Sequence, residues 1–192
     1  HTLKHEYGMN PLCVKFAPFV YTDIGRKNFE SLVQSGYDCL VAWPNGIIHR
    51  KLARLAFEYL GDSFQPFPFG QLCYPMRMAE RFDVPLVFFG ENGEAEYGGD
   101  PGANDKPCWS FADWERIYLK GSGVKKLLEI GTEIGAFSPR ELREVSEFYS
   151  LPPRGRAEFH WLGYYKYWHP QKNYYLAAEQ NGFEANPEGR SE

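Results

Sequence analysis

The sequence predicts an α/β protein with a parallel β-sheet that is covered by helices on both faces. Two observations carry this prediction. Short apolar segments without helical spacing recur along the chain, as expected for strands that are buried on both sides. These segments alternate with amphipathic helical patterns, which provide the crossover connections that parallel strands need. The chain has 192 residues and is 43% hydrophobic, which is enough for one sizeable core.

Four short segments are predicted to be parallel strands. They lie near residues 12–17, 38–43, 84–89 and 161–167. The third segment is the most informative, because its apolar run ends abruptly at Gly90 and a strongly polar stretch follows. Pro85 stands near the start of this strand, where a missing N–H group costs least.

Helices are predicted between these strands. After the polar cluster Tyr21–Asp23, either Thr22 or Asp23 is expected to cap a helix over residues 26–34. Residues 47–60 form a clear amphipathic pattern. An irregular aromatic loop over residues 64–70 is expected to precede a helix over residues 71–81.

The later part of the chain contains a predicted helical insertion over residues 108–150. Short helices are expected at 113–119 and 124–130. Ser138 and Glu141 form a capping box around Pro139, which predicts the start of a helix that runs through residue 148. A short helix over residues 173–180 is expected near the end of the chain.

Four polar clusters are expected to share the edge of the sheet where the strands end. They are Tyr21–Asp23, Asn45–Arg50, Glu91–Glu96 and Trp168–His169. Ligands of open α/β sheets bind at this edge. Carboxylates such as those of the third cluster can hold a divalent ion or exchange protons. The alternative interpretations are a solvated acidic loop and, around His49, a solvated basic helix face.

Composition excludes several classes of function. The net charge is −4 and the isoelectric point is near 5.8, so nothing indicates binding of nucleic acid. No apolar run is long enough to cross a membrane. Cysteine occurs at positions 13, 39, 73 and 108, without a C-x-x-C pair. We therefore expect neither a zinc site nor a disulfide framework. We expect a reducing, cytoplasmic location.

Several strings together resemble one family, the N-acetyl sugar amidotransferases of surface-polysaccharide and O-antigen biosynthesis. The family belongs to the PP-loop ATP pyrophosphatases. The strings span nearly the whole chain, and the fifth is specific in combination with the others. They are Tyr7-Gly-Met-Asn-Pro-Leu, Tyr21-Thr-Asp-Ile-Gly, Pro44-Asn-Gly followed by His49-Arg50, Phe64-Gln-Pro-Phe, Gly90-Glu-Asn-Gly-Glu-Ala-Glu-Tyr-Gly, Leu162-Gly-Tyr-Tyr-Lys-Tyr-Trp and Asn173-Tyr-Tyr.

The resemblance implies an adenine nucleotide alpha hydrolase-like fold and an ATP- and Mg²⁺-dependent reaction. Members of the family adenylate the carbonyl oxygen of a sugar acetamido group, and ammonia then displaces AMP to give an acetamidino group. The implied substrate is a sugar or nucleotide sugar in lipopolysaccharide synthesis. The implied partners are a glutaminase and an ammonia-channelling barrel protein. No partner nucleic acid and no membrane insertion are implied.

The resemblance also assigns residues to roles. Glu94 and Glu96 are the implied catalytic carboxylates, and Glu91 and Glu94 are implied ligands of Mg²⁺. The nucleotide-binding residues would be Tyr21, Thr22, Asp23, Gly90, Glu91 and Asn92. The substrate-binding residues would be Asn45, His49, Arg50 and Tyr97.

The sequence lacks the Ser-Gly-Gly-Lys-Asp-Ser pyrophosphate loop of the family. We therefore expect an incomplete, inactive fragment of a longer enzyme, with part of the ATP pyrophosphatase core in 1–97, the helical insertion in 98–157, the last strand and helix in 158–182 and a linker in 183–192. In the family's strand order the first strand of the sheet separates the strands near 12–17 and 84–89. We therefore expect either a gap between these two strands or a collapsed direct pairing of them, and the gap is favoured.

Two alternatives remain open at this point. Another PP-loop enzyme, such as a tRNA thiolase, shares the fold but is disfavoured by the low isoelectric point and the missing cysteine pair. A non-catalytic sugar-nucleotide-binding or assembly module would explain the missing loop.

Overall fold

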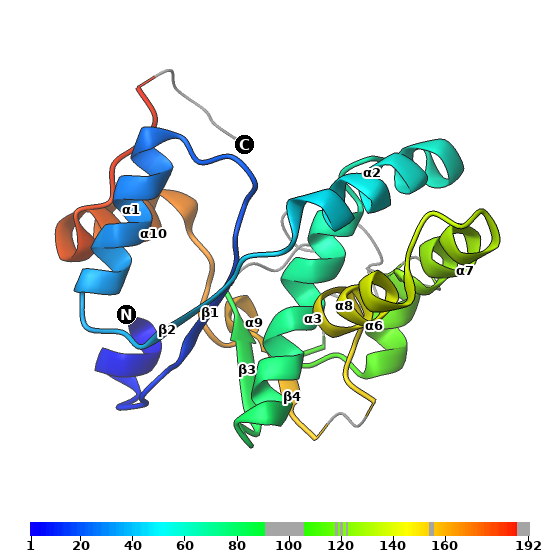
Figure 1. The fold of residues 1–192 in the computed structure, drawn as a ribbon. Coiled ribbons are helices and arrows are strands. Elements are labelled where there is room, and N and C mark those ends of the chain that lie inside the picture. The colour runs from blue at the N-terminus through cyan, green and yellow to red at the C-terminus, as the bar shows by residue number, and fades with distance from the viewer. Residues whose placement is uncertain (91–105, 118, 120, 122, 154–155, 188–192) are drawn as a thin grey trace. The chain divides into compact units, whose positions relative to one another are not determined.

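The computed structural model describes residues 1–90, 106–117, 119, 121, 123–153 and 156–187 as a mixed α/β chain (Figure 1). The chain divides into two compact units. The first unit combines residues 1–41 with residues 168–192, and the second consists of residues 42–167.

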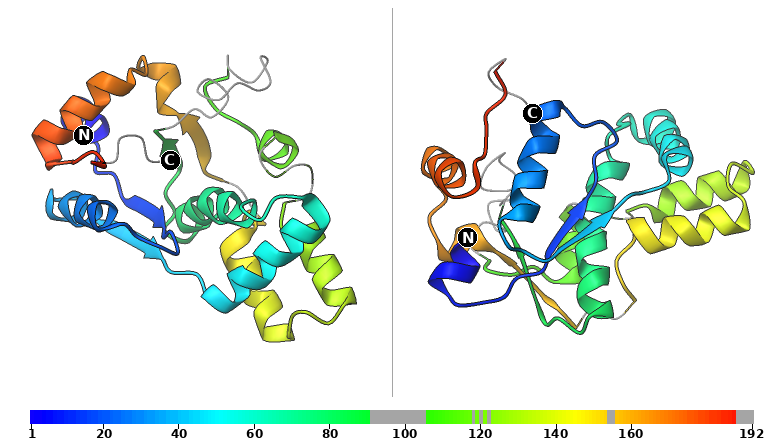
Figure 2. Two further views of the ribbon diagram at one scale, coloured as in Figure 1. Left: turned by 90° about the horizontal axis from the view of Figure 1, so that it is seen from above. Right: turned by 60° about the vertical axis from the view of Figure 1, so that its left-hand side comes forward.

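The first unit joins the two ends of the sequence. Its elements are the helical turn η1 (Thr2–Glu6), strands β1 (Cys13–Phe16) and β2 (Cys39–Ala42, whose last residue is assigned to the second unit), and helices α1 (Asp23–Gln34) and α10 (Pro170–Asn181). Figure 2 shows the end of α10 and the segment after it near α1, and the Ser31 hydroxyl of α1 donates to the Asn181 carbonyl at the end of α10. The Asn28 side chain donates to the Glu184 carbonyl and accepts from the Glu184 N–H group, each at 2.9 Å. Because both hydrogen bonds use the same amide, this contact fixes the register between two distant segments.

The second unit carries most of the helices. Its elements are α2 (Gly46–Leu60), α3 (Pro66–Arg81), β3 (Leu86–Phe89), α6 (Phe111–Ile117), α7 (Lys125–Glu133), α8 (Pro139–Tyr149), β4 (Glu158–Trp161) and α9 (Leu162–Tyr165). Helix α3 packs against α2, α8 and β3, and α7 packs against α2. The helices of the predicted insertion thus share one compact unit with α2 and α3.

The four strands that the structure describes form two small parallel sheets, β1–β2 and β3–β4. In the second sheet Leu86 pairs with Glu158 and Phe89 pairs with Trp161.

The alternation of side chains along β3 and β4 creates one apolar face. Phe159 and Trp161 are 1% exposed and join a core with Trp109 and Trp114. Phe89 contributes from the neighbouring strand, with its ring centroid 4.3 Å from that of Phe159. Because large aromatic rings dominate the apolar area that a core buries, this cluster is a major source of stability for the second unit.

Local signals explain where the helices begin and end. The Thr22 and Asn45 side chains accept hydrogen bonds from the first turns of α1 and α2. Ser138 and Glu141 form the predicted capping box at the start of α8. Helix α2 ends at Gly61, whose φ of 73° lies in the left-handed region that glycine adopts without strain.

The structure corrects two predicted boundaries. The last strand was predicted over 161–167, but β4 is Glu158–Trp161 and residues Leu162–Tyr165 form helix α9. The predicted aromatic loop over 64–70 is in large part the first turns of α3, which begins at Pro66. Proline is tolerated in a first helical turn because the N–H groups there have no intrahelical acceptor.

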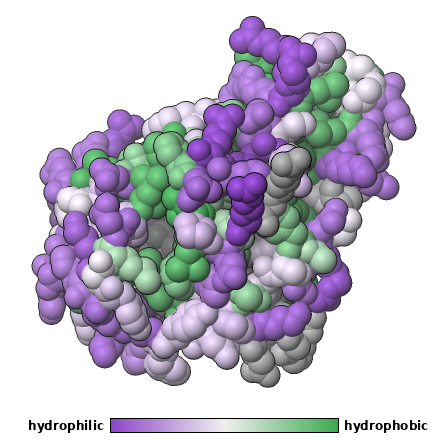
Figure 3. Space-filling view, turned by 90° about the horizontal axis from the view of Figure 1, so that it is seen from below, coloured by the Kyte–Doolittle hydropathy of each residue, from purple (hydrophilic) through white to green (hydrophobic). Residues whose placement is uncertain are grey.

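Apolar side chains also reach the surface between the polar ones, as the face in Figure 3 illustrates. The most exposed large examples are Val20, Trp43, Phe57 and Tyr167. No helix among the described residues is both long and apolar enough to cross a bilayer.

Gly131 tests the packing of α7. A Cβ atom at this position would lie 2.4 Å from the Phe137 ring and 3.1 Å from Leu55. We expect Gly131→Ala to lower the free energy of unfolding by about 1–2 kcal/mol, since overpacking outweighs the gain in helix propensity. Chemical denaturation measures this change.

Gly46 is the matched control for that substitution. It also lies in a helix, but a Cβ atom there meets nothing within 4 Å. Gly46→Ala should leave the stability unchanged or raise it. Equal stabilities of Gly131→Ala and the parent protein would contradict the packing described for α7 and Phe137.

Candidate functional site

The predicted nucleotide-binding residues Tyr21, Thr22 and Asp23 lie at the start of α1 in the first unit. The Thr22 hydroxyl accepts a hydrogen bond from the Gly25 N–H group at 3.0 Å, so it caps the helix. Asp23 is exposed in the first turn. The Lys15 ammonium lies 4.7 Å from the centre of the Tyr21 ring, which ties this segment to β1.

The predicted substrate-binding residues Asn45, His49 and Arg50 lie at the start of α2 in the second unit. The Asn45 side chain accepts from the Ile47 N–H group at 3.0 Å and thereby caps the helix. Arg50 is exposed, whereas His49 is partly buried. These three residues therefore have different environments although they share one helix start.

His49 faces the interior of the second unit. Its Nδ1 atom lies 3.0 Å from the Tyr149 hydroxyl, whose residue is 2% exposed. Burial lowers the pKa of His49 to about 4 and raises the pKa of Tyr149. At neutral pH the imidazole is uncharged, so His49 can offer a ligand a hydrogen bond but not a positive charge.

An ion pair also joins α2 and α8, the helices that carry His49 and Tyr149. The Lys51 ammonium is 2.7 Å from the Glu141 carboxylate. Hydrogen bonds from Lys51 and Ser138 lower the pKa of Glu141 to about 2. Glu141 therefore stays ionised over the whole physiological range and joins the start of α8 to α2.

The third predicted cluster begins at Gly90, which is exposed directly after β3. Its remaining residues, Glu91, Asn92, Glu94, Glu96 and Tyr97, lie outside the described residues. Within the part of the chain that is described, no group of three or more His, Cys, Asp or Glu side chains is arranged to hold a metal ion.

The structure reveals one polar cluster that the sequence analysis missed, and we call it the Glu–His–Tyr triad. It consists of Glu158, His160 and Tyr165. The His160 ring lies between the other two: Nε2 is 3.1 Å from the Glu158 carboxylate and Nδ1 is 2.6 Å from the Tyr165 hydroxyl. The alternation of Glu158 and His160 with buried Phe159 and Trp161 was the available sequence signal, since it places the two polar side chains on one face of a strand.

The triad occupies the face of the β3–β4 sheet opposite the aromatic core. His160 pairs with Phe88 in the ladder, and their ring centroids are 5.7 Å apart. Gly90 follows β3 two residues after Phe88. His160 therefore lies near the carboxyl end of this sheet, the end where ligands of parallel sheets bind.

The hydrogen bonds of the triad suit proton transfer. The Glu158 carboxylate can only accept when it is ionised, so Nε2 of His160 carries the proton of that bond and Nδ1 accepts from the Tyr165 hydroxyl. Burial, followed by the nearby Cys108, Tyr164 and Glu158, raises the pKa of Tyr165. Tyr165 is thus a protonated phenol whose oxygen can accept a proton from a ligand while its own proton passes to His160.

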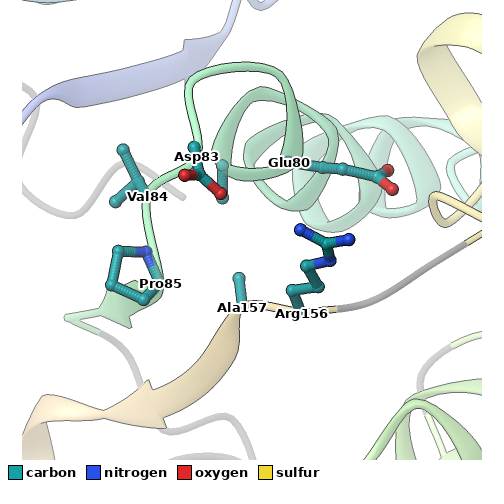
Figure 4. Close-up of a pocket in the computed structure, with 7 residues that line it drawn as sticks. Glu80, Asp83, Val84, Pro85, Arg156 and Ala157 are labelled. Atoms are coloured by element: carbon teal, nitrogen blue, oxygen red, sulfur yellow. The ribbon is translucent and has the colours of Figure 1, made fainter.

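A pocket with a volume of about 350 Å³ lies at the other end of the same sheet. It is bordered by Val84 and Pro85 before β3 and by Arg156 and Ala157 before β4. Figure 4 shows that the Arg156 guanidinium extends toward Glu80, which lies near the end of α3, while Asp83 follows that helix. The pocket lies at the amino ends of the strands, whereas the ligand site was predicted at their carboxyl ends.

No protein-family model matches the chain, and a comparison with curated proteins finds no match.

The buried His49 predicts a defined dependence of stability on pH. The unfolded chain takes up a proton near pH 6.5, whereas the folded chain does so only near pH 4. The free energy of unfolding should therefore fall by about 2 kcal/mol between pH 7 and pH 5. Denaturant titrations at these two pH values measure the loss.

His49→Gln should abolish most of this loss, because it removes the titrating group. His5→Gln is the matched control, since His5 is exposed, and it should retain the dependence of the parent protein. A His49→Gln variant that still loses about 2 kcal/mol would contradict the neutral state assigned to His49.

Proposed function

We propose that this chain is part of an ATP-dependent N-acetyl sugar amidotransferase of the PP-loop ATP pyrophosphatase type. The enzyme would convert an acetamido group of a sugar or nucleotide sugar into an acetamidino group during surface-glycan synthesis. The proposal rests on the seven strings quoted above and on the pairing of the strands.

Strand pairing is the single observation that supports the proposal most strongly. In the family, the first strand of the sheet lies between the strands that correspond to β1 and β3. The described strands pair as β1–β2 and as β3–β4, in parallel. Parallel pairing within each pair is what an α/β fold of this kind requires, because its strands run in one direction and are joined by helical crossovers.

The chemistry needs charge stabilisation near the reacting phosphate and a group that accepts a proton. The Glu91–Glu96 segment would supply carboxylates for Mg²⁺, with Glu91 and Glu94 as its ligands. The Glu–His–Tyr triad offers the proton acceptor, since a proton can pass from a ligand to the Tyr165 oxygen while His160 Nδ1 takes the phenolic proton. When ATP is bound it supplies the adenylyl group, which turns the amide oxygen into a good leaving group.

The glutaminase and the ammonia-channelling barrel protein remain the proposed partners. Ammonia is the nucleophile of the second half-reaction, and free ammonia is scarce at neutral pH because most of it is protonated. A partner that releases it beside the site solves this problem by proximity.

The proposed function predicts that Glu94→Gln and Glu96→Gln, made in the full-length protein, lower turnover strongly and stability little. A neutral amide keeps the size of the side chain but loses the charge that would hold a metal ion or a proton. Turnover is followed as pyrophosphate released from ATP in the presence of an N-acetylated nucleotide sugar and ammonium. Surface substitutions of this kind change stability by only about 0.5 kcal/mol.

Glu129→Gln is the matched control, because Glu129 is an exposed carboxylate on α7. It should leave turnover unchanged. If the Glu94 and Glu96 variants both turned over as fast as the parent protein, the interpretation of this segment as a solvated acidic loop would be favoured instead. Absence of sugar-dependent pyrophosphate release from the full-length protein would favour the non-catalytic binding module.

A further inference from the structure

Two of the four cysteines meet across the first sheet. The Cys13 N–H group donates to the Asp38 carbonyl at 2.8 Å. In a parallel ladder this bond places Cys13 directly opposite Cys39, the residue after the acceptor. Residues opposite each other on neighbouring strands point to the same face, so both thiols lie on one side of the β1–β2 sheet.

The environment of the Cys13 thiol agrees with this placement. The pKa of the Cys13 thiol is raised to about 11, first by burial and then by the charge and the hydrogen bond of Cys39. The Cys39 thiol also lies 3.6 Å from the Tyr37 carbonyl. Both cysteines are partly exposed, so small molecules can reach them.

The spacing is compatible with a covalent bond. Neighbouring strands lie about 4.8 Å apart, and disulfides join residues whose Cα atoms are about 4.4–6.8 Å apart. Exposed disulfides are the labile ones that are reduced most readily, and both cysteines are partly exposed. Such a bond is suited to reversible formation rather than to permanent cross-linking.

We propose that Cys13 and Cys39 form a redox-active thiol pair that low-molecular-weight disulfides such as oxidised glutathione convert into a cross-strand disulfide. The Cys39 thiolate attacks one sulfur of oxidised glutathione and releases one glutathione. The Cys13 thiolate then attacks the Cys39 sulfur of the mixed disulfide and releases the second glutathione. The protein loses two electrons and two protons, and glutathione disulfide gains them.

The order of the two steps follows from the environment of the thiols. Only a thiolate attacks a disulfide, and the raised pKa of Cys13 leaves it almost entirely protonated at neutral pH. Once Cys39 carries glutathione, Cys13 is held beside the sulfur that it must attack, which compensates for its low thiolate fraction.

The other two cysteines serve as internal references. Cys73 is fully buried, and burial raises its pKa to about 12, so it should not react. Cys108 is exposed and lies in the second unit. It can take up glutathione, but it has no described cysteine neighbour with which to form an intramolecular disulfide.

The test uses the whole chain in its folded state. The protein is incubated with oxidised glutathione at neutral pH, the remaining thiols are blocked with N-ethylmaleimide under denaturing conditions, and a non-reducing peptide map is recorded by mass spectrometry. We expect one pair of peptides that is linked by a disulfide between Cys13 and Cys39. Cys73 should carry N-ethylmaleimide, because its thiol has not reacted with glutathione. Reduction with dithiothreitol should restore all four thiols.

Two variants separate the steps. Cys13→Ser should accumulate a stable glutathione adduct at Cys39, because the second thiol is missing. Cys39→Ser should leave Cys13 free of glutathione under the same conditions. The proposal would be overturned if N-ethylmaleimide labelled both Cys13 and Cys39 in the parent protein after oxidation, because both would then still be free thiols. A disulfide that joins either of them to Cys108 would also overturn it. The peptide map of the parent protein decides the question even if a variant fails to fold.

Discussion

The parallel pairing of β3 with β4 is the constraint on which the second unit depends. Side chains alternate along a strand, so the register that pairs Phe89 with Trp161 also pairs Phe88 with His160. One face of the ladder then builds the aromatic core around Trp114, and the other holds the Glu–His–Tyr triad. A shift of one residue would place an imidazole in the core and an indole at the surface. Stability and the candidate chemistry therefore depend on the same few hydrogen bonds.

Elements with strong local signals were predictable from the sequence. The caps at Thr22 and Asn45 and the capping box at Ser138 act within a few residues, so they mark helix starts without any knowledge of the fold. The last strand was misplaced because the continuous aromatic run that begins at Trp161 resembles a strand buried on both faces. Strand β4 instead alternates Glu158 and His160 with buried aromatic residues, as expected for a strand with one polar face.

The candidate site was less predictable, since its contacts join residues that are distant in the sequence. The distance between His49 and Tyr149 depends on the packing of two helices 100 residues apart. The meeting of Cys13 with Cys39 depends on a strand register, which no local pattern specifies. The predicted positions at Tyr21–Asp23 and Asn45–Arg50 do lie at helix starts, where Thr22 and Asn45 serve as caps.

The central claim is that the protein transfers the oxygen of an acetamido group to AMP. The most direct measurement uses the full-length protein and an N-acetylated nucleotide sugar whose acetyl oxygen is ¹⁸O. Adenylation bonds that oxygen to the α-phosphorus of ATP, and displacement by ammonia leaves it on the AMP that departs. The account predicts ¹⁸O in the phosphate of AMP, in equal amount to the acetamidino product. Unlabelled AMP, or a label that stays with the sugar, would contradict it.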